Sequence, residues 1–218
     1  LYNNILGGIS LDGTHYFYPQ KLRGKEGSRR PFFGCSCCPP NVHRLLAAFG
    51  DYLYTQTADE LSVNLFAGST VEHPVGGQTL RLSQQTDYPH GGSVKLTVAG
   101  VSDAETTLSL RIPAWAKEAT VRLNGQEQPR PEPGRYYSLH RAWNAGDTIE
   151  LDLAMTPRIV RPHPKVDAQQ GRLAIMVGPM VYCVEEADNS GIALRPLSLP
   201  TDVTPTMTFE KDLLGGVN

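Results

Sequence analysis

Three cysteines lie within four positions of one another in the segment FFGCSCCPPNVHR, residues 32–44. They are Cys35, Cys37 and Cys38, and Pro39-Pro40 follows them directly. A thiol becomes a nucleophile or a metal ligand only after it loses its proton, and a free cysteine titrates near pH ~8.5. Chemistry at this cluster therefore needs a local feature that stabilises the thiolate.

Two features of the segment lower a thiol pKa. Proline is well tolerated in the first turn of a helix, so Pro39-Pro40 predicts a helix start, where an anion gains about 0.3–1 kcal/mol. That gain is less than one pKa unit and does not ionise a thiol alone. A soft metal such as zinc deprotonates a coordinating thiol outright. His43 is a conceivable local fourth ligand, but the usual zinc-finger spacings are absent, so a metal would take further ligands from elsewhere in the fold.

Three interpretations of the cluster remain open from the residues alone. The first is a disulfide between the neighbouring residues Cys37 and Cys38, and the second is a structural zinc site or a set of buried thiols. The third is a reactive thiolate held beside a metal. Cys183 lies in the apolar run MVYCVEE and is predicted to be a small buried hydrophobic residue, so no disulfide framework is expected.

Composition excludes several classes of partner. The net charge of −2 gives no reason to expect nucleic acid or a membrane surface as partner, and no apolar run is long enough for a transmembrane helix or a signal peptide.

Clustered thiols favour a reducing, cytoplasmic location. The sequence is compatible with a homo-oligomer but specifies no oligomeric state. Because the chain begins at Leu1 without Met, we interpret it as part of a longer protein.

The cluster is followed by a helical pattern and then by strands. Apolar residues at helical spacing predict an amphipathic helix from Asn41 to about Tyr54: Val42, Leu45, Leu46, Phe49 and Leu53. Beyond it the apolar period changes to two, with turn signals every dozen or so residues, which is typical of an antiparallel β-sandwich. The predicted strands are 60–66, 78–83, 93–100, 106–113, 119–125, 135–139, 147–153 and 171–184.

The fold class is therefore mainly β, with a helical segment in front. We expect residues 1–56 to be the end of a helical domain that carries the cysteine loop. Residues 57–186 are expected to form the β-sandwich, and residues 187–218 a loop-rich tail or the start of a further β element. Two helices cannot bury themselves alone, so the body of the helical domain would lie upstream.

The motif CCPPNVHR, the aromatic segment THYFYP before it and YLYTQTADELSVNLFAGS after it resemble a bacterial glycoside hydrolase family. The family is that of the zinc-dependent β-L-arabinofuranosidases, glycoside hydrolase family 127. The specific motifs cover residues 1–75, and a general sandwich pattern continues to about residue 185. The resemblance implies an (α/α)6 barrel that holds the active site, with β-sandwich domains behind it.

The resemblance also implies roles for individual residues. Cys37 would be the nucleophile and a zinc ligand, and Cys38 a second zinc ligand. A glutamate and a further cysteine from upstream would complete the zinc site, and an upstream glutamate would be the general acid/base. Tyr18 would lie in a substrate-facing loop, and Cys35 has no family role. The implied reaction is retaining hydrolysis of β-L-arabinofuranosides, or of a related glycoside or oligosaccharide, through a covalent thioglycosyl intermediate.

These expectations have two consequences. Without the upstream residues, the 218-residue chain alone is expected neither to hydrolyse glycosides nor to bind zinc tightly.

The alternative function of the chain is that of a non-catalytic carbohydrate-binding or structural β-sandwich module. A redox or zinc-structural module is a third possibility, and it requires a Cys37–Cys38 disulfide or a locally closed zinc site.

Overall fold

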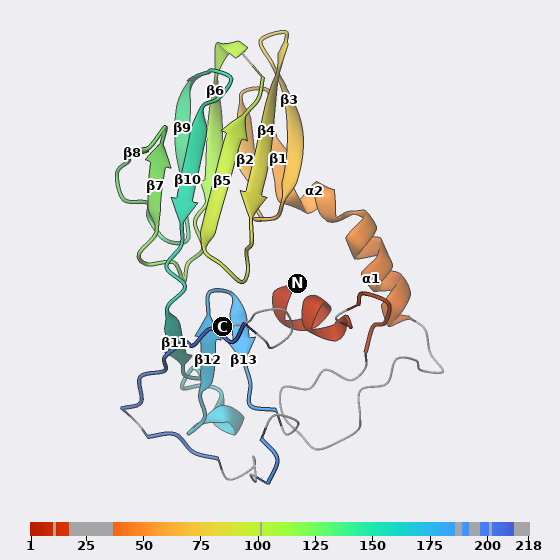
Figure 1. Cartoon of the computed structure of the whole chain (residues 1–218), viewed down its shortest axis with the longest axis vertical. Helices are drawn as coiled ribbons and strands as arrows, with labels where there is room; N and C mark the ends of the chain where they lie inside the picture. The colour runs from red at the N-terminus through yellow and green to blue at the C-terminus, as the bar shows by residue number, and fades with distance from the viewer. Residues whose placement is uncertain are drawn as a thin grey trace. The chain divides into compact units, whose positions relative to one another are not determined.

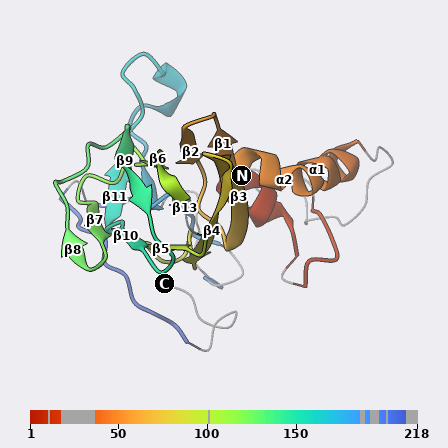
Figure 2. The same ribbon diagram turned by 90° about the horizontal axis from the view of Figure 1, so that it is seen from above.

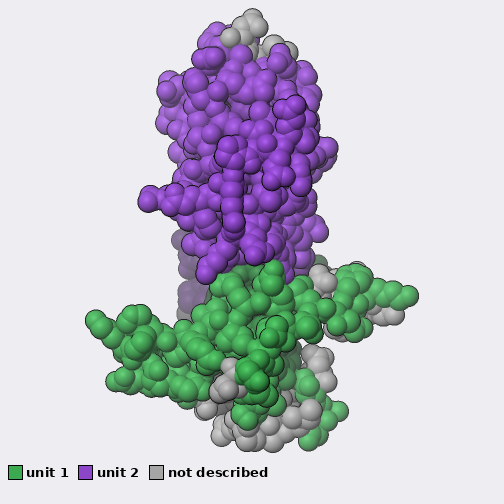
Figure 3. All heavy atoms as spheres, turned by 90° about the vertical axis from the view of Figure 1, so that its left-hand side faces the viewer, with its two compact units in different colours: residues 1–36, 156–218 green, residues 37–155 purple. Residues whose placement is uncertain are grey.

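The computed structural model describes residues 1–10, 12–17, 37–100, 102–185, 189–191, 197–200 and 202–211. It divides into two compact units, one of residues 37–155 and the other of residues 1–36 and 156–218 (Figure 3). Residues 156–185 lie outside the unit that holds the sandwich, whereas the apolar alternation predicts one region over 57–186.

The first unit begins with two short helices that lead into the first strand (Figure 1). Helix α1 spans Cys38–Ala47 and helix α2 spans Phe49–Leu53. The predicted helix is thus present, but it starts at Cys38 and is interrupted at Ala48, where φ is −96° and ψ is 8°. Val42 and Leu53 are buried, whereas Leu46 is 49% exposed.

Two sheets follow, and Figure 2 shows them as two layers when the sandwich is seen from above. The four-stranded sheet contains β1 (Tyr54–Gln56), β2 (Glu60–Val63), β6 (Ser102–Arg111) and β9 (Tyr136–Trp143), in that spatial order. The six-stranded sheet contains β3 (Ser69–Val75), β4 (Gln78–Thr86), β5 (Ser93–Val98), β10 (Thr148–Asp152), β7 (Thr120–Leu123) and β8 (Gln126–Glu127). The predicted β-sandwich is confirmed.

One strand pair departs from the antiparallel pattern. Strand β2 pairs with β6 in parallel, so that Leu61 lies opposite Leu108 and Val63 opposite Leu110. All four of these side chains are fully buried. Because side chains alternate along either kind of pair, the same residues fill the core whichever way β6 runs.

The core lies between the two sheets and is built from alternate positions of their strands. Its largest fully buried side chain is Trp143, whose Nε1–H donates to the backbone oxygen of Thr106 over 3.0 Å. A buried tryptophan needs such a partner, because an unpaired N–H costs free energy in an apolar surround.

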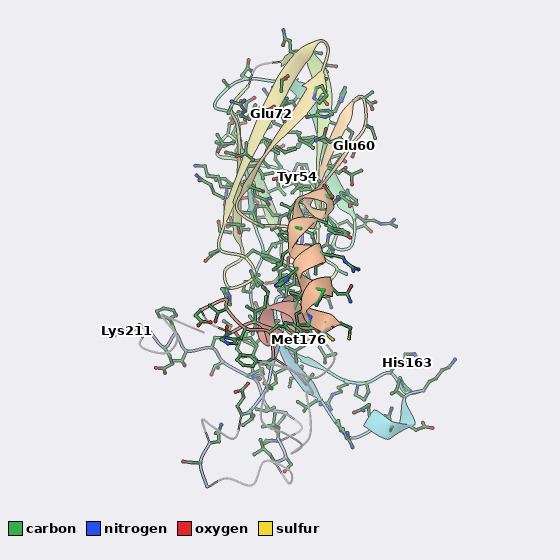
Figure 4. The ribbon with its side chains drawn as sticks, turned by 90° about the vertical axis from the view of Figure 1, so that its right-hand side faces the viewer. Tyr54, Glu60, Glu72, His163, Met176 and Lys211 are labelled. Carbon is green, nitrogen blue, oxygen red and sulfur yellow. The ribbon has the colours of Figure 1, made fainter. Side chains whose placement is uncertain are left out.

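A partly buried polar cluster joins the two sheets where α2 ends. The hydroxyls of Tyr54 and Ser69 lie 2.7 Å apart, and the Gln84 side-chain amide donates to the Tyr54 hydroxyl over 3.2 Å. Figure 4 labels Tyr54 at this junction. The backbone oxygen of Leu53 also accepts from the N–H of Asn64 at 2.8 Å. The helices are therefore anchored directly to the sandwich, with no linker between them.

The second unit combines the N-terminal segment with a separate small sheet. The π-helical turn η1 (Tyr2–Leu6) contacts β13, the last strand of an antiparallel sheet ordered β11-β12-β13. The elements of this part are β11 (Pro157–Val160), η2 (Asp167–Gln169), β12 (Ala174–Val177) and β13 (Met180–Tyr182). The apolar run 171–184 therefore forms a hairpin instead of one strand, because Gly178 turns the chain with φ of 52°.

Within the described ranges, no helix has the length and apolar character needed to cross a membrane.

Candidate functional site

Cys37 and Cys38 lie at the start of helix α1. Cys37 is the exposed N-cap residue, and Cys38 is the half-buried first residue of the helix. Their Sγ atoms lie 3.8 Å apart, far beyond the ~2.05 Å of a disulfide bond. The two residues are therefore not joined to each other by a disulfide, and that interpretation of the cluster is wrong.

The separation of the two sulfurs fits a shared zinc ion. Zinc–sulfur bonds of about 2.3 Å and tetrahedral angles place two coordinating sulfurs about 3.8 Å apart. The observed distance is 3.8 Å. The distance between the two sulfurs is therefore compatible with coordination of one metal ion.

Among the described residues, no group of three or more histidine, cysteine or acidic side chains could hold a metal ion. His43 is exposed on α1 and does not complete a site with the two cysteines. A locally closed zinc site made by these three residues is thus not present. Tyr18, the residue predicted to face the substrate, and the neighbouring Cys35 lie outside the described residues.

Two further residues support the cysteine turn, and the sequence motif contains both without indicating their role. The side-chain amide of Asn41 donates to the backbone oxygen of Cys37 over 2.8 Å. The Arg44 guanidinium in turn donates to the Asn41 Oδ1 over 3.2 Å. Their spacings of four and three residues put these groups on one face of the helix, and this spacing is the signal that could have found them.

The prolines of the motif also have a local function at the start of α1. Pro39 and Pro40 have no N–H, so the first turn has fewer unsatisfied backbone donors than an ordinary helix start. The helix N-terminus therefore offers a thiolate less stabilisation than the general value for a helix dipole. Ionisation of these thiols at neutral pH would therefore need a source of positive charge besides the helix.

Other features belong to the unit of residues 1–36 and 156–218. Cys183 is exposed, with its Sγ 3.7 Å from a carboxylate oxygen of Glu185, so the prediction that it is buried is wrong. In the N-terminal turn, hydrogen bonds from Ser10 and Thr14 lower the pKa of the exposed Asp12 carboxyl to about 2. The aromatic segment that follows is partly extended, with Tyr16 bridged to Ile9.

Comparison with known proteins places this arrangement in a family. Models of three successive domains of one glycoside hydrolase family match the chain. The β-L-arabinofuranosidase GH127 catalytic domain matches residues 1–51, the GH127 middle domain residues 60–155, and the family 127 C-terminal domain residues 157–211. The chain belongs to glycoside hydrolase family 127. The paired cysteines lie within the catalytic-domain match, and the sandwich corresponds to the middle domain.

Individual relatives agree with this assignment. A non-reducing end β-L-arabinofuranosidase of Bifidobacterium longum is 34% identical over 100% of this chain and 36% of its own length. The crystal structure of a GH127 β-L-arabinofuranosidase from Geobacillus stearothermophilus T6 superposes with a TM-score of 0.86 at 39% identity, covering 97% of this chain and 35% of that one. A second GH127 β-arabinofuranosidase structure gives a TM-score of 0.86 at 34% identity over 97% of this chain and 36% of that one. The chain thus spans about a third of the length of these relatives.

Proposed function

We propose that this chain contributes the nucleophile to a retaining glycoside hydrolase that acts on β-L-arabinofuranosides or closely related glycosides. The observation that carries the proposal is the pair of thiols, 3.8 Å apart at a helix start, inside the segment that matches the GH127 catalytic domain. The relatives named as β-L-arabinofuranosidases supply the substrate class.

In the proposed reaction, the Sγ of Cys37 attacks the anomeric carbon of the sugar. A carbon–sulfur bond forms as the bond to the leaving oxygen breaks, and a carboxylic acid gives that oxygen its proton. Water then attacks the same carbon, the carbon–sulfur bond breaks, and the carboxylate takes the proton of the water. Two inversions at one carbon leave the configuration unchanged.

Zinc, when bound, would keep the two thiols deprotonated at neutral pH. Cys38 would hold the ion beside Cys37, so that the nucleophile keeps its position between turnovers. Asn41 and Arg44 would fix the backbone of the turn, because the Asn41 amide is bonded to the Cys37 carbonyl. Among the described residues no cluster supplies the other metal ligands, so these and the acid/base are proposed to come from the rest of the catalytic domain.

The test uses the full-length protein with its complete catalytic domain and an aryl β-L-arabinofuranoside as substrate. We expect Cys37→Ser to lower kcat/KM by more than about 1,000-fold, and Cys38→Ser to lower the zinc content below one ion per chain. Cys183→Ser is the matched control, because Cys183 is exposed and lies outside the catalytic-domain match. Proton NMR of the first product should show the retained anomer. Full activity in Cys37→Ser, or an inverted product, would contradict the proposal.

The same assay tests whether the 218-residue chain acts alone. We expect no hydrolysis and less than one zinc per chain, since the described residues hold only two of the proposed ligands together. Turnover of the aryl glycoside by this chain would show that the catalytic acid lies within it.

A further inference from the structure

A two-residue turn, Asn124-Gly125, joins strands β7 and β8 at one edge of the six-stranded sheet (Figure 1). Both residues are exposed and have a positive φ, 50° at Asn124 and 78° at Gly125. Such values are typical of the type I′ turns that connect hairpin strands. Asn124 is the one residue other than glycine with a positive φ in the described part of the chain, so the hairpin uses the tolerance of asparagine for this conformation.

The side chain of Asn124 joins this turn to the turn that precedes β10. Its Nδ2 donates to the Asp147 Oδ1 over 2.8 Å, and its Oδ1 accepts from the Thr148 N–H at 2.8 Å. The backbone N–H of Asn124 also donates to the Thr148 oxygen over 2.9 Å. The contact therefore needs a side chain with a donor at one end and an acceptor at the other, which an amide provides and a carboxylate does not.

The Asp147 carboxylate makes this contact sensitive to charge. Its residue is 8% exposed, and its Oδ2 accepts from the Asn144 N–H at 2.9 Å and lies 3.6 Å from the Arg141 guanidinium. Each of these partners, like the Asn124 amide, is a donor. A second carboxylate beside Asp147 would replace a donor by a like charge in a place with little access to water.

The sequence makes Asn124 reactive toward the loss of its amide. Of the eight asparagines in the chain, only Asn124 is followed by glycine. The backbone nitrogen of the next residue can attack the asparagine Cγ: a carbon–nitrogen bond forms, the bond to Nδ2 breaks, and ammonia leaves with the backbone proton. Glycine favours this ring closure because it has no Cβ and permits many backbone conformations. Water then opens the cyclic imide at either carbonyl, which gives aspartate or isoaspartate, so the net change exchanges water for ammonia.

We propose that Asn124 is a site of spontaneous deamidation, and that the carboxylate it forms separates the β7–β8 hairpin from the turn before β10. The aspartate product can still accept from the Thr148 N–H, but it presents an oxygen to the Asp147 Oδ1 where the amide donated over 2.8 Å. The isoaspartate product adds one atom to the backbone, so it no longer fits a two-residue turn. None of these residues lies in the catalytic-domain match, so the inference is independent of the proposed function.

The folded turn controls the rate of this reaction. The hydrogen bonds of Asn124 hold its side chain at both ends, and ring closure needs the side chain to leave them. Strand β8 has two residues, Gln126–Glu127, and lies at the edge of its sheet, where local opening costs least. We therefore expect the reaction to proceed through opening of the hairpin and to run faster in urea-unfolded protein than in folded protein.

Peptide mapping of the full-length protein after incubation in oxygen-18 water at mildly alkaline pH tests the first part of the proposal. The peptide with Asn124 should gain one oxygen-18 atom. The peptide with Asn144, which is also exposed but is followed by Ala145, is the internal control and should keep its mass. Retention of the Asn124 amide, or modification of Asn144 at the same rate, would overturn the assignment of the site.

Hydrogen exchange tests the second part. We expect Asn124→Asp to speed exchange at the Asn144 and Thr148 amides about tenfold, because a hydrogen bond to a charged group is lost and a repulsion is added. Gln126→Glu adds the same charge at a neighbouring exposed position and should leave both amides unchanged. Deamidated protein, separated from the parent by ion exchange, gives the same measurement without a substitution. Equal exchange in the deamidated and parent proteins would show that the Asn124 amide does not hold the two turns together.

Discussion

The side chain of Asn3 is hydrogen-bonded to the backbone on both sides of Met180. Its Nδ2 donates to the oxygen of Pro179 over 2.8 Å, and its Oδ1 accepts from the N–H of Val181 at 2.7 Å. Strand β13 is the edge of its sheet, so these backbone groups would otherwise face water or another strand. One amide from the catalytic-domain match thereby ties the N-terminal segment to the C-terminal domain.

Replacing Asn3 by alanine should remove the side-chain hydrogen bonds that hold this edge strand. We expect Asn3→Ala to speed hydrogen exchange at the Val181 amide by roughly tenfold, because its acceptor is lost and a typical hydrogen bond contributes about 1 kcal/mol. Asn4→Ala, at the neighbouring exposed position, is the control. Equal protection of Val181 in both variants would show that the Asn3 contact does not hold the edge.

Gly92 allows a close approach between strand β5 and the chain that follows β10. A Cβ at Gly92 would lie 1.9 Å from the backbone oxygen of Leu153, and the Leu153 N–H already donates to the Gly92 oxygen over 2.9 Å. We expect Gly92→Ala to lower the free energy of unfolding by about 3 kcal/mol, because the backbone of one of the two segments would have to move to make room for the methyl group.

Gly50 provides the opposite case for the same substitution. It lies in helix α2, and a Cβ at this position would meet no neighbouring heavy atom within 4 Å beyond the backbone of its own helix. Gly50→Ala should therefore raise the free energy of unfolding by about 0.5–1 kcal/mol, by lowering the entropy of the unfolded chain. Urea denaturation measures both variants, and similar values for the two would contradict the steric argument.

His73 makes the stability of the sandwich depend on pH. The side chain is fully buried on β3, and within the described structure neither ring nitrogen has a hydrogen-bond partner. Burial lowers the pKa of His73 below its usual 6.5, against a smaller opposing effect of Asp59. The unfolded chain therefore binds the proton more readily, and stability that is complete above pH ~6.5 is lost as the pH falls below it.

The pH effect of His73 is measurable by denaturation between pH 7.5 and about 5. The contribution of one such group approaches a slope of about 1.4 kcal/mol per pH unit below its unfolded pKa. We expect His73→Leu to flatten this dependence, whereas His90→Gln, at an exposed position, should leave it unchanged. An unaltered slope in His73→Leu would assign the pH dependence to other groups.

Asn41 is expected to position the cysteine turn without taking part in the chemistry. Asn41→Ala removes the hydrogen bond to the Cys37 carbonyl, and we expect zinc affinity and activity of the full-length protein to fall about 10- to 100-fold. His43→Ala, exposed on the same helix, is the control. If added zinc restores kcat in Asn41→Ala, the residue acts through the metal site. A loss in thermal stability with unchanged zinc affinity would instead indicate a purely structural role.

Strand alternation was sufficient to predict most of the sandwich, but it missed the short strands β1 and β8 and the longer strand β3. That strand reads STVEHPV, with His73 at a core position that alternation expects to be apolar and Pro74 beside it. Proline is tolerated there because β3 is the edge of its sheet, where a missing N–H breaks no ladder. Edge position depends on the arrangement of all the strands, and it cannot be predicted from a seven-residue window.

The site was predictable where its geometry is local. Adjacent cysteines before two prolines indicate a helix start, and α1 begins at Cys38. The hydrogen bonds of Asn41 and Arg44 depend on which rotamers the side chains adopt, and the pattern of residue types does not determine rotamers. Metal ligands from distant parts of the chain are still harder to predict from residue spacing, because only the fold brings such residues together.

The parallel pairing of β2 with β6 also determines the order in which the sandwich can assemble. Between these two strands the chain passes through β3, β4 and β5 of the other layer. The β2–β6 ladder can close only after these three strands have been synthesised, and β9 pairs with the other edge of β6. During synthesis on the ribosome, neither layer can therefore be completed before strands of the other layer have emerged, and a chain cut within residues 64–101 would have to reassociate from two separate pieces.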